Sequence, residues 1–289
     1  MACDGPSYHS CTTAGLRLTI AALLSLPRVH RLDRDTSGLL LFAKSAEAAG
    51  TLTHAFRTRA VTKYYTGLTV RRSAKKMGTV VGDMEKGRGC VHARAWQQPS
   101  VHAVNVSRPS WADPYRRGSY MLTRGKENPA VTRFVTWGLP SLGLRAFVCR
   151  PETGKTHQIR VAMRSMQAPV LGDARYGTVR DARSEWEARR GADVDVAAGE
   201  LWGDAPCGDG TAQLGWDRMY LHACAVRVRL PDETISLVCP PTHGALFTHP
   251  AFEAWFQGQF AGPMAGDECW FPDSPLLTSS NGGGPRHEH

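Results

Sequence analysis

The densest group of residues able to do chemistry lies at positions 30–38, which read HRLDRDTSG. Two carboxylates, Asp33 and Asp35, stand there among the cations Arg31 and Arg34. Nearby cations favour the ionised carboxyl group, which then serves as a nucleophile or a base. A turn in which the acidic side chains bond to backbone amides, with the arginines in solvent, accounts for the same residues. Spacing alone leaves both interpretations open.

A second polar cluster spans positions 151–160, which read PETGKTHQIR. A glycine turn leads there into an expected helix at 156–166, with Thr156 as its N-cap. The free amides of a helix start, together with Lys155, suit a phosphate or a carboxylate. The GKT triplet resembles part of a P-loop, but the full pattern requires a glycine where Cys149 stands. We therefore exclude a nucleotide cofactor.

A third cluster reads TKYYT at positions 62–66, within an expected strand at 62–70. Side chains alternate across a strand, so Lys63 and Tyr65 share one face while Tyr64 lies on the other. We expect one tyrosine in the core and the other at a cleft.

The elements that must position these clusters follow an α+β pattern. The apolar run 38–43 predicts a buried strand, and Ser45 with Glu47 begins a helix that continues to about Arg57. Further strands are expected at 144–150 and 219–230. Strands joined by helices and hairpins indicate an α+β sheet protein.

Composition sets the broad class. The chain has 289 residues, 42% of them apolar, and a net charge of +9. These values exclude collagen-like, coiled-coil and wholly disordered chains, and the charge favours a polyanionic partner. Positions 181–217 carry nine acids against three bases, so the remainder carries +15. We interpret this acidic, small-residue stretch as a surface insertion.

Cysteine and hydropathy patterns restrict the compartment. The eight cysteines are scattered, without a CxxC pair or zinc-like histidine spacing, so we expect free intracellular thiols and no metal site. Apolar runs fall short of the roughly 20 residues that span a membrane, and no charged leader precedes the run in 1–29. We expect an intracellular protein without membrane contact, in the cytoplasm first, with an organelle or the nucleus as alternatives.

Taken in chain order, the three clusters resemble the motifs of the RluA-type pseudouridine synthases. The resemblance rests on HRLDRDTSGLLLFAK, the Lys63–Tyr65 segment, TGKTHQIRVAMRSMQAPVLGDARYG and RMYLHA, and it covers roughly 28–84, 120–178 and 216–258. It implies the pseudouridine synthase fold, with a mixed, mostly antiparallel central sheet flanked by helices and loops and a catalytic cleft across the sheet. It also implies a monomer that isomerises uridine to pseudouridine in structured RNA, ribosomal or transfer, without cofactor or metal.

The same resemblance implies roles for individual residues. Asp33 attacks the uridine, at the sugar or at the ring, and Arg160 pairs with it. Tyr65 stacks on the flipped base and helps to remove the C5 proton. Arg31 enters the space left by the base, because a planar cation recovers part of the unstacking cost. The remaining substrate-binding residues are Ile159 in the pocket wall, His30 and Thr36 in the loop, and Lys63, Lys155 and His157.

One departure from the family and one pair of acids raise other functions. Residues 1–29 lack the Lys-Pro-x-Gly signature with which the family opens, so we expect a truncated or atypical segment and a missing N-terminal strand. A catalytically inactive RNA-binding or ribosome-assembly protein is therefore the alternative function. Paired acids also suggest glycoside hydrolysis, but Asp33 and Asp35 on one loop cannot flank a sugar from opposite faces.

The expected domain organisation follows from these patterns. A catalytic domain spans 30–258, and a flexible tail spans 259–289. Within the domain, insertions occupy about 86–117 and 181–217. The first insertion mixes arginines with Trp96, Trp111 and Tyr115, which suits either RNA binding or an ordinary surface loop.

Overall fold

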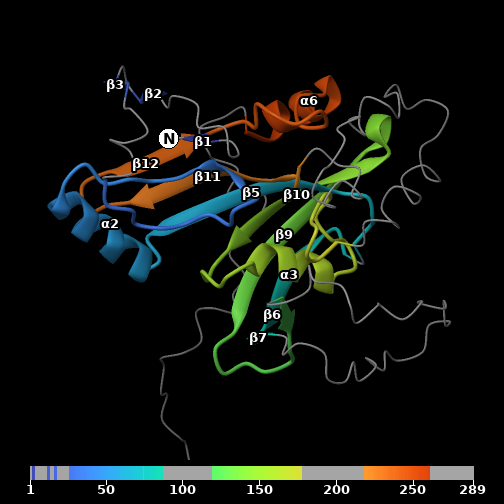
Figure 1. Cartoon of the computed structure of the whole chain (residues 1–289), viewed down its shortest axis with the longest axis horizontal. Coiled ribbons are helices and arrows are strands. Elements are labelled where there is room, and N and C mark those ends of the chain that lie inside the picture. Colours follow the sequence, from blue (N-terminus) through green and yellow to red (C-terminus); the bar gives the residue numbers. More distant parts are fainter. Residues whose placement is uncertain are drawn as a thin grey trace, which may run out of the picture.

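The fold was obtained as a computed structural model that describes residues 26–73, 75–86, 119–177 and 218–260, together with three two-residue strands near the N-terminus. Its main feature is an eight-stranded sheet (Figure 1). The strands of this sheet are β1 (Ala2–Cys3), β4 (Ser37–Leu39), β5 (Val61–Thr69), β6 (Met77–Gly82), β9 (Ala130–Leu139), β10 (Leu144–Pro151), β11 (Leu221–Arg229) and β12 (Thr234–Val238).

The sheet order is β1-β4-β11-β5-β10-β9-β6, and β12 pairs with β11. Every neighbouring pair is antiparallel except β4 with β11, which is parallel. Two small ribbons lie outside this sheet, β2 (Thr12–Thr13) with β3 (Leu16–Arg17) and β7 (Met84–Lys86) with β8 (Tyr120–Leu122). The mixed, mostly antiparallel sheet of the α+β prediction is thus confirmed.

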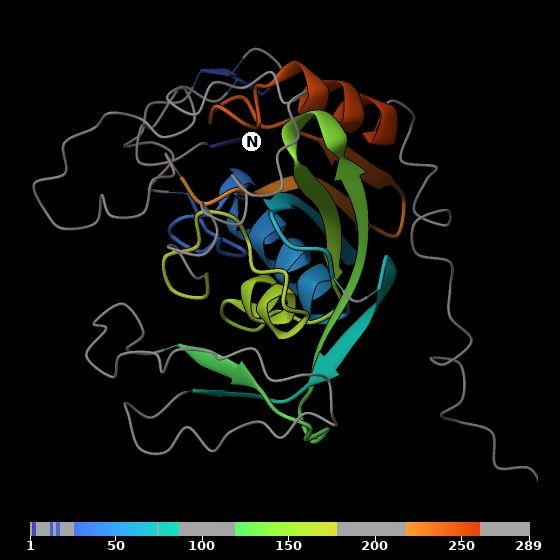
Figure 2. The ribbon, with the colours of Figure 1, turned by 90° about the vertical axis from the view of Figure 1, so that its right-hand side faces the viewer.

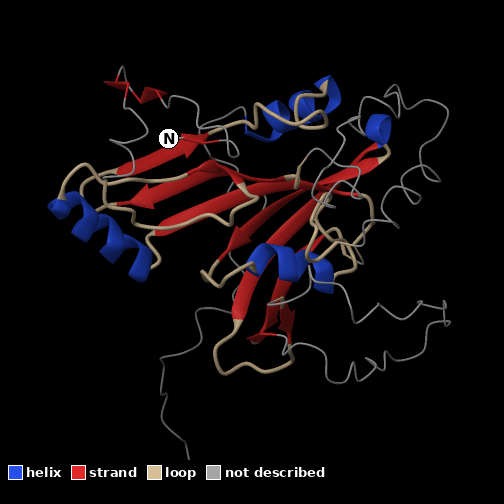
Figure 3. Ribbon diagram, viewed as in Figure 1, coloured by secondary structure: helices blue, strands red, loops and turns tan. Residues whose placement is uncertain are grey.

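Helices cover both faces of the sheet. The helix α6 (Pro250–Phe260) lies on one face, and α2 (Ala46–Arg57) and α3 (Gln158–Ser165) lie on the other (Figures 2 and 3). A 3-10 turn, Pro140–Leu142, joins β9 to β10. Phe252 and Phe256 of α6 pack on one apolar cluster, which includes Tyr64, while Ile159 of α3 packs on a second cluster, which includes Tyr65. Each face of the sheet therefore carries a buried apolar cluster, and the cavity described below lies on the side of the second cluster.

A bulge in β11 sets which side chains reach each face. The register with β5 shifts between Ala223 and Ala225. As a result Cys224 and Ala225 both join the core beneath α6, whereas Val226 packs with α2. The bulge lies where Gly38 of β4 approaches the Ala223 backbone, at a φ of +111° that favours glycine.

Several expected elements match closely. The helix at 46–57 is capped by Ser45, whose Oγ accepts from the Ala48 amide at 3.1 Å. The strands expected at 62–70, 144–150 and 219–230 correspond to β5, β10 and β11. Cys149, Cys224 and Cys239 are free thiols among the described residues, as expected.

Two expectations about element ends are wrong. The strand expected at 38–43 ends at Leu39, because the Leu41 amide bonds to His30 and Phe42 makes an isolated bridge with Arg28. Thr156 is not the N-cap of α3: the cap is His157, in the left-handed region at φ 58°, with no capping bond from its side chain.

Of the expected domain organisation, the structure describes part of the N-terminal region and only the first residue of the insertions. Beside β4 the structure holds β1, which pairs Ala2 with Leu39 and Cys3 with Gly38. A short strand therefore lies at the sheet edge, although the family's opening signature is absent from the sequence. Of the insertion at 86–117 only Lys86 is described, and both the insertion at 181–217 and the tail beyond residue 260 lie outside the described residues. The proposed roles of these segments stay predictions.

Candidate active site

A cavity of about 500 Å³ opens on the side of the sheet that carries α2 and α3. Its walls come from the loop before β4, the end of α2, the strand β5, and the turn that leads into α3. All ten residues singled out from the sequence line it: His30, Arg31, Asp33, Thr36, Lys63, Tyr65, Lys155, His157, Ile159 and Arg160. The fold therefore brings together three clusters that are far apart along the chain.

The loop that carries Asp33 is held on both sides of that residue. The Thr36 amide donates to the Asp33 carbonyl at 3.0 Å, and the Leu41 amide donates to His30 Nε2 at 2.9 Å. The His30 ring lies 5.0 Å from the Phe56 ring. Burial, and then the charge of Lys63, lower the pKa of His30 to about 4. His30 is therefore a neutral group that fixes the loop.

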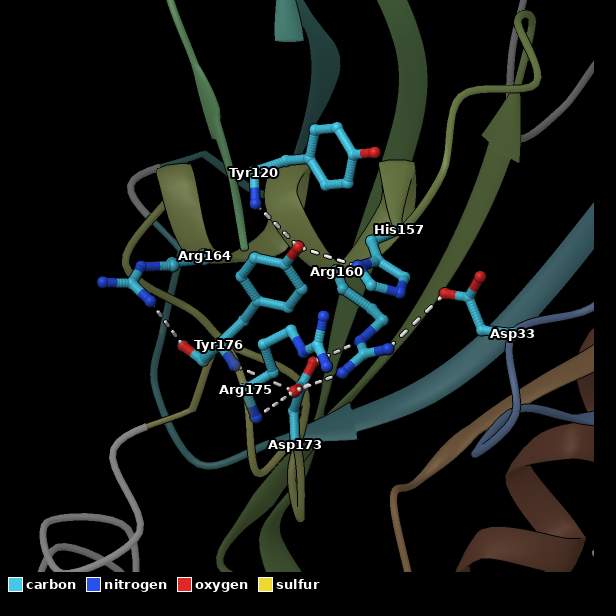
Figure 4. A network of polar contacts seen from close by, with 8 residues as sticks. All are labelled: Asp33, Tyr120, His157, Arg160, Arg164, Asp173, Arg175 and Tyr176. Carbon is cyan, nitrogen blue, oxygen red and sulfur yellow. Dashed lines mark hydrogen bonds and ion pairs between the residues drawn. The ribbon is translucent and has the colours of Figure 1, made fainter. Parts of the chain in front are cut away.

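The Arg160 guanidinium contacts two carboxylates at once (Figure 4). Its Nε and Nη2 donate to Asp173 at 2.7 and 2.8 Å, while its Nη1 lies 3.6 Å from Asp33 Oδ2. Burial opposes its charge, but the bonds to Asp173 and the charge of Asp33 raise the pKa of Arg160. The expected pair of Asp33 and Arg160 is present, and Asp173 makes the shorter contacts.

Asp173 is the main residue that the sequence reasoning missed. Its side chain is fully buried, at 0% exposure. Its Oδ1 also accepts from the amides of Arg175 and Tyr176, both at 2.9 Å. The signal available in the sequence was an acid placed between the apolar run Val170–Leu171 and a tyrosine, inside the GDARYG stretch.

Tyr176 connects the site to the small ribbon of β7 and β8. Its hydroxyl accepts from the Tyr120 amide at 3.0 Å and shares a hydrogen bond of 2.8 Å with His157 Nδ1 (Figure 4). Its ring also packs against the Arg160 guanidinium, 5.0 Å from the ring centroid. Burial lowers the pKa of His157, which favours the neutral imidazole.

The two tyrosines of the third cluster lie on opposite faces of β5, as the alternation of side chains along a strand predicted. Tyr64 is fully buried in the core beneath α6, while Tyr65 faces the cavity. Burial, followed by the charge of Asp33, raises the pKa of Tyr65, so that it stays a phenol. Burial lowers the pKa of Lys63, whose Nζ lies 5.8 Å from the centroid of the Phe56 ring.

Other polar residues near the cavity are either bonded or turned away from it. Lys155 Nζ donates to Asn128 Oδ1 at 2.6 Å. Asp35 is exposed and does not line the cavity, in contrast to Asp33. Among the described residues no cluster of three His, Cys, Asp or Glu side chains is arranged for a metal, and no helix has the length and hydropathy to cross a membrane.

The fold and this cavity agree with the comparisons to known proteins. Residues 4–165 match the family model for RNA pseudouridylate synthase, and the chain belongs to this family. Its relatives include a protein called ribosomal large subunit pseudouridine synthase D from Vibrio vulnificus, 32% identical over 70% of this chain and 48% of the relative. The chain is thus an RluA-type isomerase that acts on RNA.

Two other relatives and a solved structure extend the comparison. An uncharacterised RNA pseudouridine synthase of Haemophilus influenzae is 31% identical over 86% of this chain and 84% of its own length. The mitochondrial pseudouridylate synthase RPUSD4 of Bos taurus is 31% identical over 82% of this chain and 60% of its own length. A human protein titled RNA pseudouridylate synthase domain containing 1 superposes with a TM-score of 0.50 at 24% identity, covering 80% and 73% of the two chains, which shows the fold alone.

Proposed function

We propose that this protein converts uridine to pseudouridine in a structured RNA, with Asp33 as the nucleophile and the target base flipped into the cavity. One observation carries the proposal: Arg160, fixed by two short bonds to Asp173, presents its remaining nitrogen to Asp33. Of the two carboxylates, Asp33 is the one with access to the cavity, with a side chain 20% exposed against 0% for Asp173. A charged group held in place but still reachable is what a nucleophile needs.

The reaction requires two bond exchanges at the same carboxylate. In the sugar route, Asp33 bonds to C1′ while the bond from C1′ to N1 breaks and the base leaves as an anion. The base then turns, C5 bonds to C1′, and Asp33 is released. C5 loses its proton, and N1 gains one. In the ring route Asp33 bonds first to C6 of the pyrimidine, and the bond from C1′ to N1 breaks. C5 then bonds to C1′, the bond from C6 to Asp33 breaks, C5 loses its proton, and N1 gains one. Arg160 stabilises the Asp33 charge before attack and after release in both routes.

Tyr65 supports this chemistry from the cavity wall. Its ring offers a stacking surface for the uracil, and Ile159 of the same apolar cluster lines the cavity beside it. Its pKa is raised by burial and then by the Asp33 charge. That second contribution disappears while Asp33 is part of a covalent bond. The Tyr65 hydroxyl is therefore easier to deprotonate while Asp33 is part of the covalent bond than in the free enzyme.

The remaining cavity residues bind and orient the RNA. Arg31 lines the cavity and is exposed to solvent, so that its side chain enters the RNA helix as the target base leaves that helix. Lys155 and His157 face the cavity from the α3 side, and His30 with Thr36 maintains the loop around Asp33.

The relatives support ribosomal RNA as the target class. The Vibrio vulnificus relative carries the large ribosomal subunit in its name. We propose a monomer without a nucleotide cofactor that modifies ribosomal RNA, with transfer RNA as the competing target. A mitochondrial relative favours an organelle over the nucleus as the alternative to the cytoplasm.

The test is pseudouridine mapping of total RNA from cells that carry the wild-type chain, the Asp33→Asn variant or the Asp35→Asn variant. We expect at least one uridine site that is modified by the wild type and by Asp35→Asn but not by Asp33→Asn. Equal maps for all three would refute the catalytic proposal. They would favour an inactive RNA-binding or ribosome-assembly protein instead.

A further inference from the structure

Lys63 is a cation enclosed in the cavity. It lies on β5 two residues before Tyr65, on the same strand face, and both side chains line the cavity. The Phe56 ring of α2 covers it, with Nζ 5.8 Å from the ring centroid. Its pKa is lowered by burial, and no neighbouring carboxylate contributes to that shift.

No carboxylate among the described residues compensates this charge. The two acids of the cavity have other partners: Asp33 contacts Arg160 at 3.6 Å, and Glu152 contacts Arg150 at 2.9 Å. His30, the neighbour of Lys63, is neutral, because burial and the Lys63 charge lower its pKa to about 4. Lys63 is half-buried. A half-buried cation without a counter-charge opposes folding, so its presence calls for an anion that arrives with a ligand.

The surroundings of Lys63 are themselves positive. Arg31, Arg57 and Arg59 line the same cavity, and all three are exposed. A cavity with low-dielectric walls and an excess of one charge concentrates ligands of the opposite charge. Of the groups in RNA, only the phosphodiester carries that charge at neutral pH.

We propose that Lys63 binds a phosphodiester of the substrate RNA, at or next to the nucleotide whose base stacks on Tyr65. This subsite rests on the proposed function. Side chains two positions apart on a strand stand about 7 Å apart, which suits a base on one and its backbone phosphate on the other. Lys63 thus fixes the backbone of the flipped nucleotide, while Asp33 acts on its sugar or base.

The experiment measures binding of a fluorescein-labelled decauridylate by anisotropy, over a series of potassium chloride concentrations. The proteins are the wild type, Lys63→Met, Lys63→Arg and the control Lys75→Met, which removes an exposed lysine outside the cavity. Each phosphate contact to a single strand adds about 0.7 to the slope of log affinity against log salt. We expect Lys63→Met to lower the slope by about that amount and to weaken binding about tenfold or more. Lys63→Arg and Lys75→Met should retain the wild-type slope.

Urea denaturation of the same proteins separates binding from folding. Removal of a half-buried charge that has no counter-charge should leave Lys63→Met at least as stable as the wild type. An unchanged salt slope in this variant, with pseudouridine formation that still depends on Asp33, would overturn the phosphate subsite alone. Failure of the wild type to bind decauridylate at any salt concentration, together with no site that depends on Asp33, would overturn the subsite and the proposed function.

Discussion

Replacement of Asp173 by asparagine distinguishes the role of Asp173 from that of Asp33, the other carboxylate that contacts Arg160. The substitution keeps the volume of the side chain but removes its charge and places an NH2 group at the Oδ2 position, to which Arg160 Nε now donates. The two amide bonds from Arg175 and Tyr176 to Oδ1 can persist. The change is therefore directed at the pair with Arg160, which is buried and bonded at 2.7 and 2.8 Å.

The expected cost follows from the burial of the pair. Removing one partner of a buried ion pair costs about 3–5 kcal/mol, because the other charge loses its compensation. Asp33, at 3.6 Å, still compensates part of the Arg160 charge, so we expect the lower end, about 3 kcal/mol. Arg160 also loses its fixed orientation, and a displacement of about 1 Å in a catalytic group lowers kcat about 100-fold.

The Asp33→Asn variant is the matched comparison. Asp33 makes one long contact and is partly exposed, so its charge contributes about 1 kcal/mol or less to stability. We expect urea denaturation to show a large loss of stability for Asp173→Asn and a small change for Asp33→Asn. Turnover on an RNA identified by mapping should fall in Asp173→Asn and vanish in Asp33→Asn. Equal urea midpoints for Asp173→Asn and the wild type would refute the reasoning from burial.

Two further predictions concern the loop that carries Asp33. Gly38→Ala should destabilise the protein by more than about 1 kcal/mol in urea denaturation. The reason is that Gly38 has a φ of +111° and that a Cβ there would meet the Ala223 backbone. A urea midpoint equal to that of the wild type would contradict this prediction. The pKa of His30 is lowered from 6.5 to about 4, so the stability gained from neutral His30 is complete above pH 6.5 and is lost as pH falls toward 4. Between pH 6.5 and pH 4 the His30→Gln variant should therefore lose less stability in urea denaturation than the wild type does. The control His54→Gln, which removes an exposed histidine, should behave like the wild type. Parallel curves of stability against pH for all three proteins would contradict this prediction.

Local patterns explain what the sequence could predict. The Ser45 cap, the apolar spacing of α2 and the alternation in β5 and β11 each depend on residues close together in the chain. The ten site residues were predicted to act together because three motifs resemble one family in order. The structure places them in one cavity.

Non-local contacts explain what the sequence could not predict. The end of β4 depends on the Leu41 amide turning to His30, and the cap of α3 depends on a left-handed His157, neither of which a propensity rule foresees. The strands β6 and β9 and the helix α6 escaped notice, since their faces are defined only by distant partners. Phe252 and Phe256 of α6, for example, join a cluster with residues of β5 and β9.

Asp173 shows why the most informative contact was also the least predictable one. Arg160 and Asp173 are 13 positions apart and meet only because the chain turns back after α3 and fixes Asp173 by two amides. That arrangement gives Asp173 both short bonds and leaves Asp33 a single contact of 3.6 Å. A bidentate bond to Asp33 would have occupied one lone pair on each of its oxygens, the atoms that attack the uridine in the proposed mechanism. The buried acid therefore fixes the position of Arg160, so that the accessible acid has its charge compensated and its oxygens available for the proposed attack.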